Sequence, residues 1–326
     1  MPSYGKDAYV LVGQLGTGRN GTMKLMRNKK TKELVAAKWV PRTVGGGLSK
    51  NTEREIVNHR KLLHPNIIRF REVYMTDEHL VIVMEYASNG QLLERIDTSG
   101  KLDEPLARKL YQQLMDGMNY SHKQDIYHRD LRMENLLLDG SFFEPVLKIS
   151  DFSYSKNAVL DSQPKTNVGT PAYTPPELLL AVRNEGAAYD GAAIDVWSSG
   201  IILYYMLAGH LPFTDPAVPN ALSRKMMQRI VNVQYEYPAD HELSPEAQDL
   251  IKHIFVAEPA QRIQVDDILK HPWLSGIPLP TRDDLEVAPQ TEDDIRDIVE
   301  RARQRRLAKR TSLHKIQSGI QTQSEE

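Results

Sequence analysis

The stretch HRDLRMENLLLDG, residues 128–140, gathers charged and amide side chains directly before an apolar run. Its polar members include Arg129, Asp130, Arg132, Glu134 and Asn135. We expect the apolar run to be buried, and polar groups beside a buried segment are costly unless they find partners. Carboxylate and carboxamide oxygens could accept a proton or bind a hard cation. The stretch is therefore either a catalytic loop or a polar turn between two elements.

A second candidate is the glycine pattern G-x-G-x-x-G formed by Gly16, Gly18 and Gly21. It follows one β-rich run and leads into another, TMKLM, rather than into a helix. A hairpin of this kind can lie over nucleotide phosphates, because backbone N–H groups approach an anion closely where no Cβ intervenes. The pattern alone also fits an ordinary hairpin with spare glycines.

Lys38 strengthens the phosphate interpretation. It follows Val35, Ala36 and Ala37 in a run that reads as a buried strand. A buried ammonium is costly without an anionic partner, and a phosphate together with a helix carboxylate would supply two. Glu55, in the helical segment TEREIVNHR, is the candidate carboxylate. The alternative for Glu55 is a solvated helix charge, which is what most glutamates are.

The composition excludes several classes of function. The 326 residues are 40% hydrophobic and 26% charged, with a formal net charge of −2 and no cysteine. Disulfide scaffolds, thiolate metal sites and cysteine nucleophiles are excluded, and the balanced charge predicts neither nucleic acid nor an anionic membrane as partner. We find no secretory signal pattern and expect no apolar run of the roughly 18 residues that span a bilayer. An intracellular soluble protein is expected.

The pattern of elements changes along the chain. Residues 9–70 carry short β-rich runs and one helical segment, whereas the chain beyond residue 91 has the 3.6-residue periodicity of amphipathic helices. We expect a strand-rich lobe over residues 1–86, a larger helical lobe over 87–275, and a C-terminal tail over 276–326. The fold class is α+β.

With these motifs in order between Tyr9 and Trp273, the chain resembles a eukaryotic protein kinase. The resemblance implies a bilobal fold whose β-rich first lobe holds one main helix, with ATP and Mg²⁺ as cofactors. In the family, the aspartate of H-R-D accepts or orients the proton of the substrate hydroxyl, which is the role implied for Asp130. Asn135 and Asp151 would hold magnesium, while Lys38 would bind ATP phosphates and pair with Glu55.

The resemblance also assigns residues around the nucleotide and in the architecture of the second lobe. Glycines 16, 18 and 21 would cover the phosphates, and Glu85 and Ala87 would offer backbone groups to adenine. Apolar walls are expected from Leu15, Met23, Ala36, Met84 and Leu137. Read without the motifs, these are core residues. Glu177 and Arg262 should form a buried ion pair, and Asp195 should brace the backbone of the catalytic loop.

Two positions depart from the family pattern. Arg132 stands where serine/threonine kinases have a lysine that touches the transferred phosphate, so the charge is retained. Ser153 replaces the glycine of D-F-G, which removes backbone freedom at a hinge. We expect altered switching rather than lost chemistry. The alternative is a nucleotide-binding pseudokinase scaffold with little catalysis, although Lys38, Asp130 and Asp151 are all present.

Thr170 in GTPAY resembles the threonine that serine/threonine kinases place beside the catalytic aspartate. We therefore expect serine/threonine rather than tyrosine specificity, although arginine at position 132 resembles some tyrosine kinases. A small-molecule acceptor fits poorly, because it would not need this peptide-binding segment. Glu134 and Gln91 stand where basophilic kinases often have acids that face substrate arginines, and only Glu134 is acidic. A weak to moderate preference for basic residues upstream of the target is expected. Glu134 and Thr170 are thus the substrate residues.

The segment from Asp151 to Glu177 resembles an activation segment. Thr166 is the leading candidate phosphosite and Ser162 the second, and the alternative for each is an ordinary loop hydroxyl. A phosphate on Thr166 would add about −1.5 to −2 charges, which Arg129 could bind.

Several longer strings, such as HLVIVMEYASNGQLLERI, are similar to plant and green-algal stress kinases, the second subfamily of sucrose-non-fermenting-related kinases. In the tail, Thr291 and Asp294 predict a capping box for a helix over about 291–303, with an apolar stripe of Ile295, Ile298, Val299 and Ala302. That subfamily docks such a helix on the small lobe, so we expect it to hold Glu55 in place. Arginines and lysines beyond residue 302 form a basic end, most simply a solvated helix end.

The expected partners are proteins that carry serine or threonine, and an upstream kinase or phosphatase. A monomer is expected. The expected location is the cytoplasm, with the nucleus as a second compartment.

Overall fold

The computed structural model describes residues 5–18, 21–42, 50–152, 171–180, 189–215, 217–218, 223–237, 243–277, 290–291 and 293–302. The chain forms two compact units. The first comprises residues 1–63, 68–86 and 284–326, and the second comprises residues 64–67 and 87–283. Each unit is described by itself.

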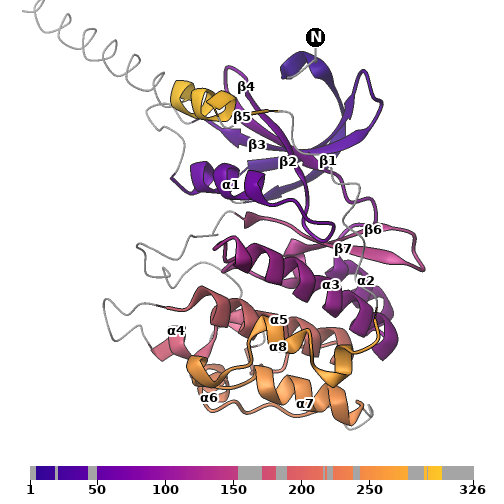
Figure 1. Cartoon of the computed structure of the whole chain (residues 1–326), viewed down its shortest axis with the longest axis vertical. Coiled ribbons are helices and arrows are strands. Elements are labelled where there is room, and N and C mark those ends of the chain that lie inside the picture. Colours follow the sequence, from indigo (N-terminus) through magenta and orange to yellow (C-terminus); the bar gives the residue numbers. More distant parts are fainter. Residues whose placement is uncertain are drawn as a thin grey trace, which may run out of the picture. The chain divides into compact units, whose positions relative to one another are not determined.

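The first unit is built on an antiparallel sheet with the strand order β1-β2-β3-β5-β4 (Figure 1). Its strands are β1 (Tyr9–Gly18), β2 (Gly21–Asn28), β3 (Leu34–Pro41), β4 (Phe70–Met75) and β5 (His79–Glu85). The short helix η1 (Lys6–Ala8) precedes β1, and α1 (Lys50–Lys61) follows β3. Residues 293–302 form a further helix, drawn in yellow near β4 in Figure 1.

One face of this sheet carries its own hydrophobic core. Alternate residues of a strand point to opposite faces, so Val35 and Ala37 of β3 share a face with Val81 and Val83 of β5. All four side chains are buried and pack in one cluster, whose other members are Ala8, Tyr9, Met26 and Tyr74. The opposite face is therefore the one that carries Ala36 and Lys38.

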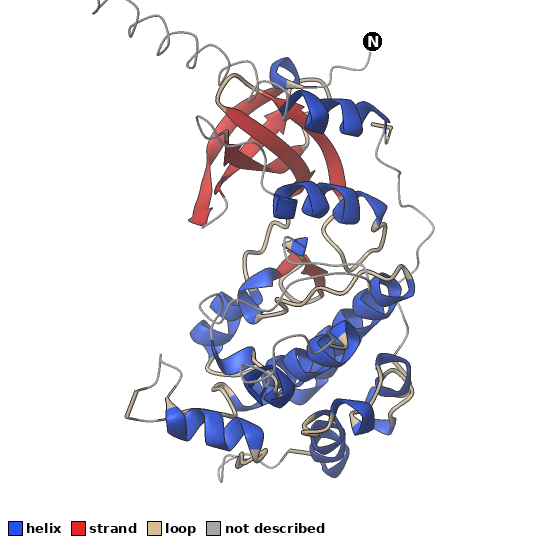
Figure 2. Ribbon diagram, turned by 90° about the vertical axis from the view of Figure 1, so that its left-hand side faces the viewer, coloured by secondary structure: helices blue, strands red, loops and turns tan. Residues whose placement is uncertain are grey.

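Helices make up most of the second unit, as the blue ribbons of Figure 2 show. They are α2 (Leu92–Ser99), α3 (Glu104–Lys123), α4 (Pro176–Leu180), α5 (Gly191–Ala208), α6 (Arg224–Val231), α7 (Pro245–Ile254) and α8 (Val265–Ile268). A two-stranded antiparallel sheet pairs β6 (Leu136–Gly140) with β7 (Pro145–Ile149). The described 3-10 turns of this unit are η2 (Met133–Asn135), η4 (Pro171–Tyr173), η6 (Pro259–Gln261) and η7 (Pro272–Leu274).

Local sequence signals explain where these helices begin. Asp103 accepts a hydrogen bond from the N–H of Leu106 at the start of α3, and Ser244 does the same for Ala247 at the start of α7. Short polar side chains at this position satisfy N–H groups that have no partner inside the helix.

The helix α5 is the central core element of the second unit. Buried residues, most of them apolar, lie all around its circumference, and Trp197 and Ile201 have no exposed surface. By length and composition α5 could cross a membrane, so the expectation that no such segment exists is wrong. Because 83% of this helix is buried within the protein, its apolar character is that of a core helix.

The expected α+β fold class is confirmed: one unit is strand-rich with one main helix, and the other is mostly helical.

Candidate active site

The glycine loop joins β1 to β2, and cross-strand pairs bring Gly16 opposite Met23 and Gly18 opposite Gly21. Gly21 has a φ of 142°, and a Cβ there would lie 2.4 Å from the carbonyl oxygen of Trp39, so a side chain is not accommodated. No described atom lies within 4 Å of a Cβ built on Gly16. Packing against the described residues therefore does not require a glycine at position 16.

The central ion pair of the first unit joins Lys38 on β3 to Glu55 on α1. The Lys38 Nζ atom lies 2.6 Å from Oε1 of Glu55, and the residues are only 8% and 4% exposed. Two charges removed from water in this way are stable only when paired in good geometry. The expected partnership of Lys38 with Glu55 is thus present, and it fixes the position of α1 against β3.

Apolar residues lie beside Lys38 on the same face of the sheet. Met23 pairs with Lys38 across β2 and β3, and two residues further along β3, Ala36 pairs with Met84 of β5. Residues two positions apart on a strand share a face, so Met23, Ala36 and Met84 lie on the face of Lys38. The predicted adenine contact Glu85 uses its own N–H for the carbonyl of Arg69, at 2.9 Å. Any backbone hydrogen bond from Glu85 to adenine would therefore use its carbonyl oxygen as the acceptor.

The predicted residue Leu15 is 43% exposed on β1. Ala87 and Leu137 belong to the second unit, where Ala87 is buried and Leu137 is half-buried on β6.

In the second unit, the carboxylate of Asp195 holds the backbone of His128 and Arg129. It accepts hydrogen bonds from the N–H groups of His128 at 2.8 Å and Arg129 at 2.7 Å, and it lies 2.9 Å from Nε2 of His122. Arg129 has a φ of 64°, a left-handed conformation that is uncommon for residues other than glycine. The fully buried Asp195 side chain offsets the cost of this conformation, as the predicted brace requires.

Asn135 is fixed next to Asp130. Its side-chain Nδ2 atom donates to the backbone carbonyl of Asp130 at 2.8 Å. The backbone carbonyl of Asn135 accepts from the N–H and the Oγ hydroxyl of Ser150, at 2.9 Å each. Because the amide nitrogen is engaged, the carboxamide oxygen is the ligand atom that Asn135 offers. Asp151 directly follows Ser150 and has a φ of 64°. Amide and carboxylate oxygens are what hard divalent cations prefer, so Asn135 and Asp151 fit such an ion.

Burial raises the pKa of the Asp130 carboxyl group, His128 and Arg132 oppose the rise, and the nearby Asp151 and Glu134 charges add to it. A carboxylate with a raised pKa is a better proton acceptor than an ordinary surface aspartate. The site therefore adjusts Asp130 in the direction that a general base requires.

Arg132 and Glu134 form a two-pronged ion pair. Arg132 Nε lies 2.9 Å from Glu134 Oε2, and Arg132 Nη2 lies 2.7 Å from Oε1. The side chains are 25% and 31% exposed. This planar geometry is the strongest that an arginine and a carboxylate can form. The charges of Arg132 and Glu134 therefore neutralise each other in this structure.

The ion pair expected between Glu177 and Arg262 is also present in the second unit. Arg262 Nη1 and Nη2 each lie 2.9 Å from a Glu177 oxygen, and the arginine also donates to the carbonyls of Val256 and Ala193. Its side chain has no exposed surface. The pair ties α4 to the segment that follows α7.

Four predicted positions lie outside the described residues: Ser153, Ser162, Thr166 and Thr170. Residues 153–170 of the activation segment therefore enter none of the geometry above.

The tail reaches the first unit through Gln290, which sequence reasoning missed. Its side-chain amide accepts from Val73 N–H and donates to Val73 C=O, each at 2.8 Å, on the edge strand β4. The Gln290 carbonyl accepts from Nε and Nη2 of Arg60 on α1. The predicted capping box is confirmed, since Thr291 and Asp294 exchange backbone-to-side-chain hydrogen bonds. The predicted stripe is also confirmed: Ile295 and Ala302 are buried, while Ile298 and Val299 are half-buried.

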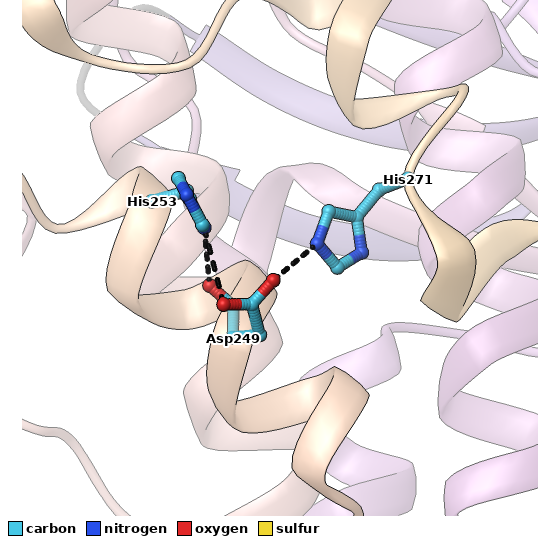
Figure 3. Close-up of side chains that lie close together, drawn as sticks. All are labelled: Asp249, His253 and His271. Carbon is cyan, nitrogen blue, oxygen red and sulfur yellow. Dashed lines mark hydrogen bonds and ion pairs between the residues drawn. The ribbon is translucent and has the colours of Figure 1, made fainter.

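A histidine-rich cluster lies elsewhere in the second unit, where Asp249 stands between the rings of His253 and His271 (Figure 3). His271 Nδ1 accepts from the N–H of Trp273 at 3.2 Å, so its proton is on Nε2, which donates to Asp249 at 3.0 Å. Neither ring nitrogen of His271 is then left to bind a metal. The cluster is a structural cap for η7.

Comparison with known proteins agrees with this geometry. The protein kinase domain family matches residues 9–274. The glycine hairpin and the buried lysine–glutamate pair of the first unit are typical of that family, and so is the H-R-D aspartate beside an asparagine in the second unit. The chain belongs to the protein kinase family.

Within that family, three plant relatives illustrate the similarity. The chain is 50% identical to serine/threonine-protein kinase SAPK9 of Oryza sativa subsp. japonica over 288 residues, which is 88% of this chain and 77% of the relative. It is 52% identical to serine/threonine-protein kinase SRK2I of Arabidopsis thaliana over 273 residues, 83% of this chain and 73% of that protein. It is 47% identical to serine/threonine-protein kinase SRK2A of Physcomitrium patens over 307 residues, which is 91% of this chain and 85% of that protein.

The predicted membership in the second subfamily of sucrose-non-fermenting-related kinases is confirmed by these relatives. The protein is an ATP-dependent serine/threonine protein kinase whose substrates are proteins, and its domain uses ATP with a divalent metal ion.

Proposed function

We propose that Asp130 is the group that accepts or orients the proton of the substrate hydroxyl, and that Asn135 and Asp151 hold Mg²⁺. The observation that carries this proposal is the hydrogen bond from Asn135 Nδ2 to the Asp130 carbonyl, which ties the metal ligand to the proton acceptor. Bound Mg²⁺ would neutralise charge on the phosphates. Phosphoryl transfer needs such neutralisation and positioning more than covalent help from the protein.

The first unit has a separate task in this mechanism. Lys38, oriented by Glu55, binds ATP phosphates, and the backbone of the glycine loop covers them. Arg132, which belongs to the second unit, supplies a second positive charge for the transferred phosphoryl group, in the role for which relatives of this fold use a lysine. The apolar residues Met23, Ala36 and Met84 provide the wall for the adenine base.

Regulation by phosphorylation of the activation segment is part of the proposal. Thr166 is the proposed phosphosite and Ser162 the second, with Arg129 as the group that binds the phosphate. The backbone of Arg129 is held by Asp195, which supports a fixed position for its guanidinium group. An upstream kinase and a phosphatase would then set the activity, and Ser153 would alter how the segment switches.

The tail is proposed to stabilise the active position of Glu55. Gln290 bonds both to β4 and to Arg60, which lies on the same helix as Glu55. Anchoring α1 in this way would limit its movement away from Lys38. Signalling in stress responses, a monomeric state and a cytoplasmic location with access to the nucleus complete the proposal.

A metal titration tests the assignment of Asn135 and Asp151. Transfer of labelled phosphate to a serine peptide is measured against Mg²⁺ concentration for the wild type, Asn135→Ala and Asp151→Asn. We expect both variants to require more Mg²⁺ and to transfer less phosphate at saturation. Wild-type Mg²⁺ dependence in both variants would overturn the assignment. Small-molecule acceptors serve as the control for substrate class.

A further inference from the structure

We propose that the exposed edge of β1, at residues 10–13, is a docking site for an extended protein segment rich in glutamate or aspartate. The segment would add one more strand to the sheet of the first unit, beside β1. The inference is independent of the proposed function, because residues 10–13 and the turn that follows β2 take no part in the proposed phosphate transfer.

The two edge strands of the sheet differ in their surroundings. β1 is the first strand in the order β1-β2-β3-β5-β4, and β4 is the last. On β4, the Gln290 side-chain amide bonds to both backbone groups of Val73. Within the described ranges, the strand that pairs with Val10, Leu11 and Val12 is β2 alone. An edge of this kind presents backbone N–H and C=O groups to another chain.

The β1 edge also exposes apolar side chains. Val10, Leu11 and Val12 are 43%, 61% and 44% exposed, in consecutive positions. Successive residues of a strand point to opposite faces, so both faces of the sheet offer apolar surface beside the edge. No described atom lies within 4 Å of a Cβ built on Gly13, so the space next to this position is open as well. Charged side chains or proline commonly block strand addition at an edge, and these positions have neither.

Basic side chains beside this edge indicate the charge of the partner. Arg27 pairs with Val10 across β1 and β2, and the Lys29 N–H donates to the Ala8 carbonyl at 2.8 Å. The turn that follows β2 therefore lies next to the start of β1. The basic residues at the end of β2 and in this turn are all exposed: Arg27, Lys29, Lys30 and Lys32.

The nearby carboxylates among the described residues do not balance these charges. Glu33 follows the turn, but its carboxylate pairs with Arg71. Glu72 on β4 is buried. Asp7 in η1 is exposed, and Lys6 precedes it in the same turn. The surroundings of the first half of β1 therefore carry an excess of positive charge, which attracts an acidic segment and repels a basic one.

An extended protein segment fits these features better than another polyanion. Its backbone would pair with the open edge, its apolar residues would cover Val10, Leu11 and Val12, and its carboxylates would meet the basic turn. In this mode of recognition, main-chain hydrogen bonds supply affinity and side chains supply specificity. A nucleic acid strand would meet the charges but leave the edge unpaired. The pairing of β1 with β2 is irregular between Leu11 and Gly13, so the added strand should be short.

The test measures the binding of a dye-labelled peptide to the full chain by fluorescence anisotropy. The peptide has about eight residues, in which valine alternates with glutamate. We expect saturable binding that weakens as salt is added. Replacing its glutamates by lysine, or placing proline at its centre, should weaken binding at least about tenfold, because the charge or the backbone donor is lost. No binding, or equal binding of all three peptides, would overturn the inference.

Variants of the chain locate the bound peptide. Leu11→Thr should weaken binding about fivefold or more, and Lys30→Glu about threefold or more. The matched controls are Leu180→Thr on α4, where the leucine is 57% exposed, and Lys252→Glu on α7, and both should bind as the wild type does. Amide hydrogen exchange at residues 10–13 should slow when the peptide binds. Slowing at other residues with residues 10–13 unchanged would contradict the site.

Two other occupants of the edge are distinguished by the same variants. A single-stranded oligothymidine that binds as tightly as the acidic peptide, and is weakened by Lys30→Glu but not by Leu11→Thr, would identify a nucleic acid site and overturn the inference. A chain that is dimeric in analytical ultracentrifugation, and monomeric as Leu11→Thr, would show that a second copy covers the edge, with the same consequence. The expected result is a monomer that prefers the acidic peptide.

Discussion

Lys38 and Glu55 form a buried ion pair at 2.6 Å that joins the third strand of the sheet to the helix α1. Neither charge has appreciable contact with water. The attraction between them offsets the cost of removing both charges from solvent, and each therefore depends on the other.

Removal of one partner should destabilise the protein more than removal of both. We expect Glu55→Gln or Lys38→Met to lower the free energy of unfolding by about 3 kcal/mol, because the remaining charge is left buried. The double variant Lys38→Met/Glu55→Leu should recover much of that loss while staying inactive. Urea unfolding and phosphate transfer measure the two effects. If the double variant loses as much unfolding free energy as the two single variants lose together, Lys38 and Glu55 do not depend on each other, and the prediction is contradicted.

The Glu177–Arg262 pair predicts that arginine cannot be replaced by lysine. Arg262→Lys loses the two-pronged contact with Glu177 and the donors to Val256 and Ala193, so we expect a loss of about 3 kcal/mol in stability. The matched control is Lys270→Arg, whose partner Asp267 is largely exposed, and which should change stability by less than about 0.5 kcal/mol. Thermal unfolding distinguishes the two, and an equal small effect at both positions would argue against a buried pair.

The raised pKa of Asp130 predicts a pH-dependent cost in stability. A carboxyl group whose pKa is raised on folding favours the folded state at pH values below its unfolded pKa of about 3.9, and that contribution is lost as the pH rises through the folded pKa. Ionised Asp130 therefore destabilises the protein at neutral pH. We expect Asp130→Asn, without nucleotide or metal, to unfold at a higher temperature than the wild type at pH 7, with the gap narrowing as the pH falls. A gap that widens on acidification would contradict the assignment.

The contact of Gln290 with β4 predicts that the tail affects activity from a distance. Gln290→Ala removes both hydrogen bonds to Val73 and should lower the free energy of unfolding by about 1–2 kcal/mol. Because α1 is then held less firmly, the rate of phosphate transfer should also fall several-fold. Asp297→Asn, an exposed position on the helix that follows, is the matched control and should retain activity. Truncation after Pro280 should have a larger effect than Gln290→Ala. Undiminished activity of the truncated chain would contradict a supporting role for the tail.

The Lys38–Glu55 contact could be predicted because a lysine in a buried strand requires an anion, and few carboxylates stand on a helix nearby in sequence. The same holds for the tail, where the capping pattern and the apolar spacing predict a helix with one buried face. The fold class follows from the change between strand periodicity and helix periodicity along the chain.

Other contacts left no signal in the sequence. Gln290 bonds to backbone atoms 217 residues away, and a single glutamine in a polar segment carries no periodic pattern. Arg132 and Glu134 are two residues apart, a spacing that does not bring side chains together on a helix. They meet because Arg132 is extended, with φ −158° and ψ 161°, directly before the turn of η2. The membrane-like composition of α5 was also missed, since burial and not composition identifies it as a core helix.

The central claim is that Asp130 acts on the substrate hydroxyl, and a comparison of phosphate transfer by wild type and Asp130→Asn tests it most directly. Both proteins are offered Mg²⁺, labelled ATP and a serine peptide, and unfolding is monitored to establish that both are folded. We predict a loss of about 10²–10⁴ in transfer rate for the variant with nucleotide binding retained. Equal transfer by the two folded proteins would contradict the claim.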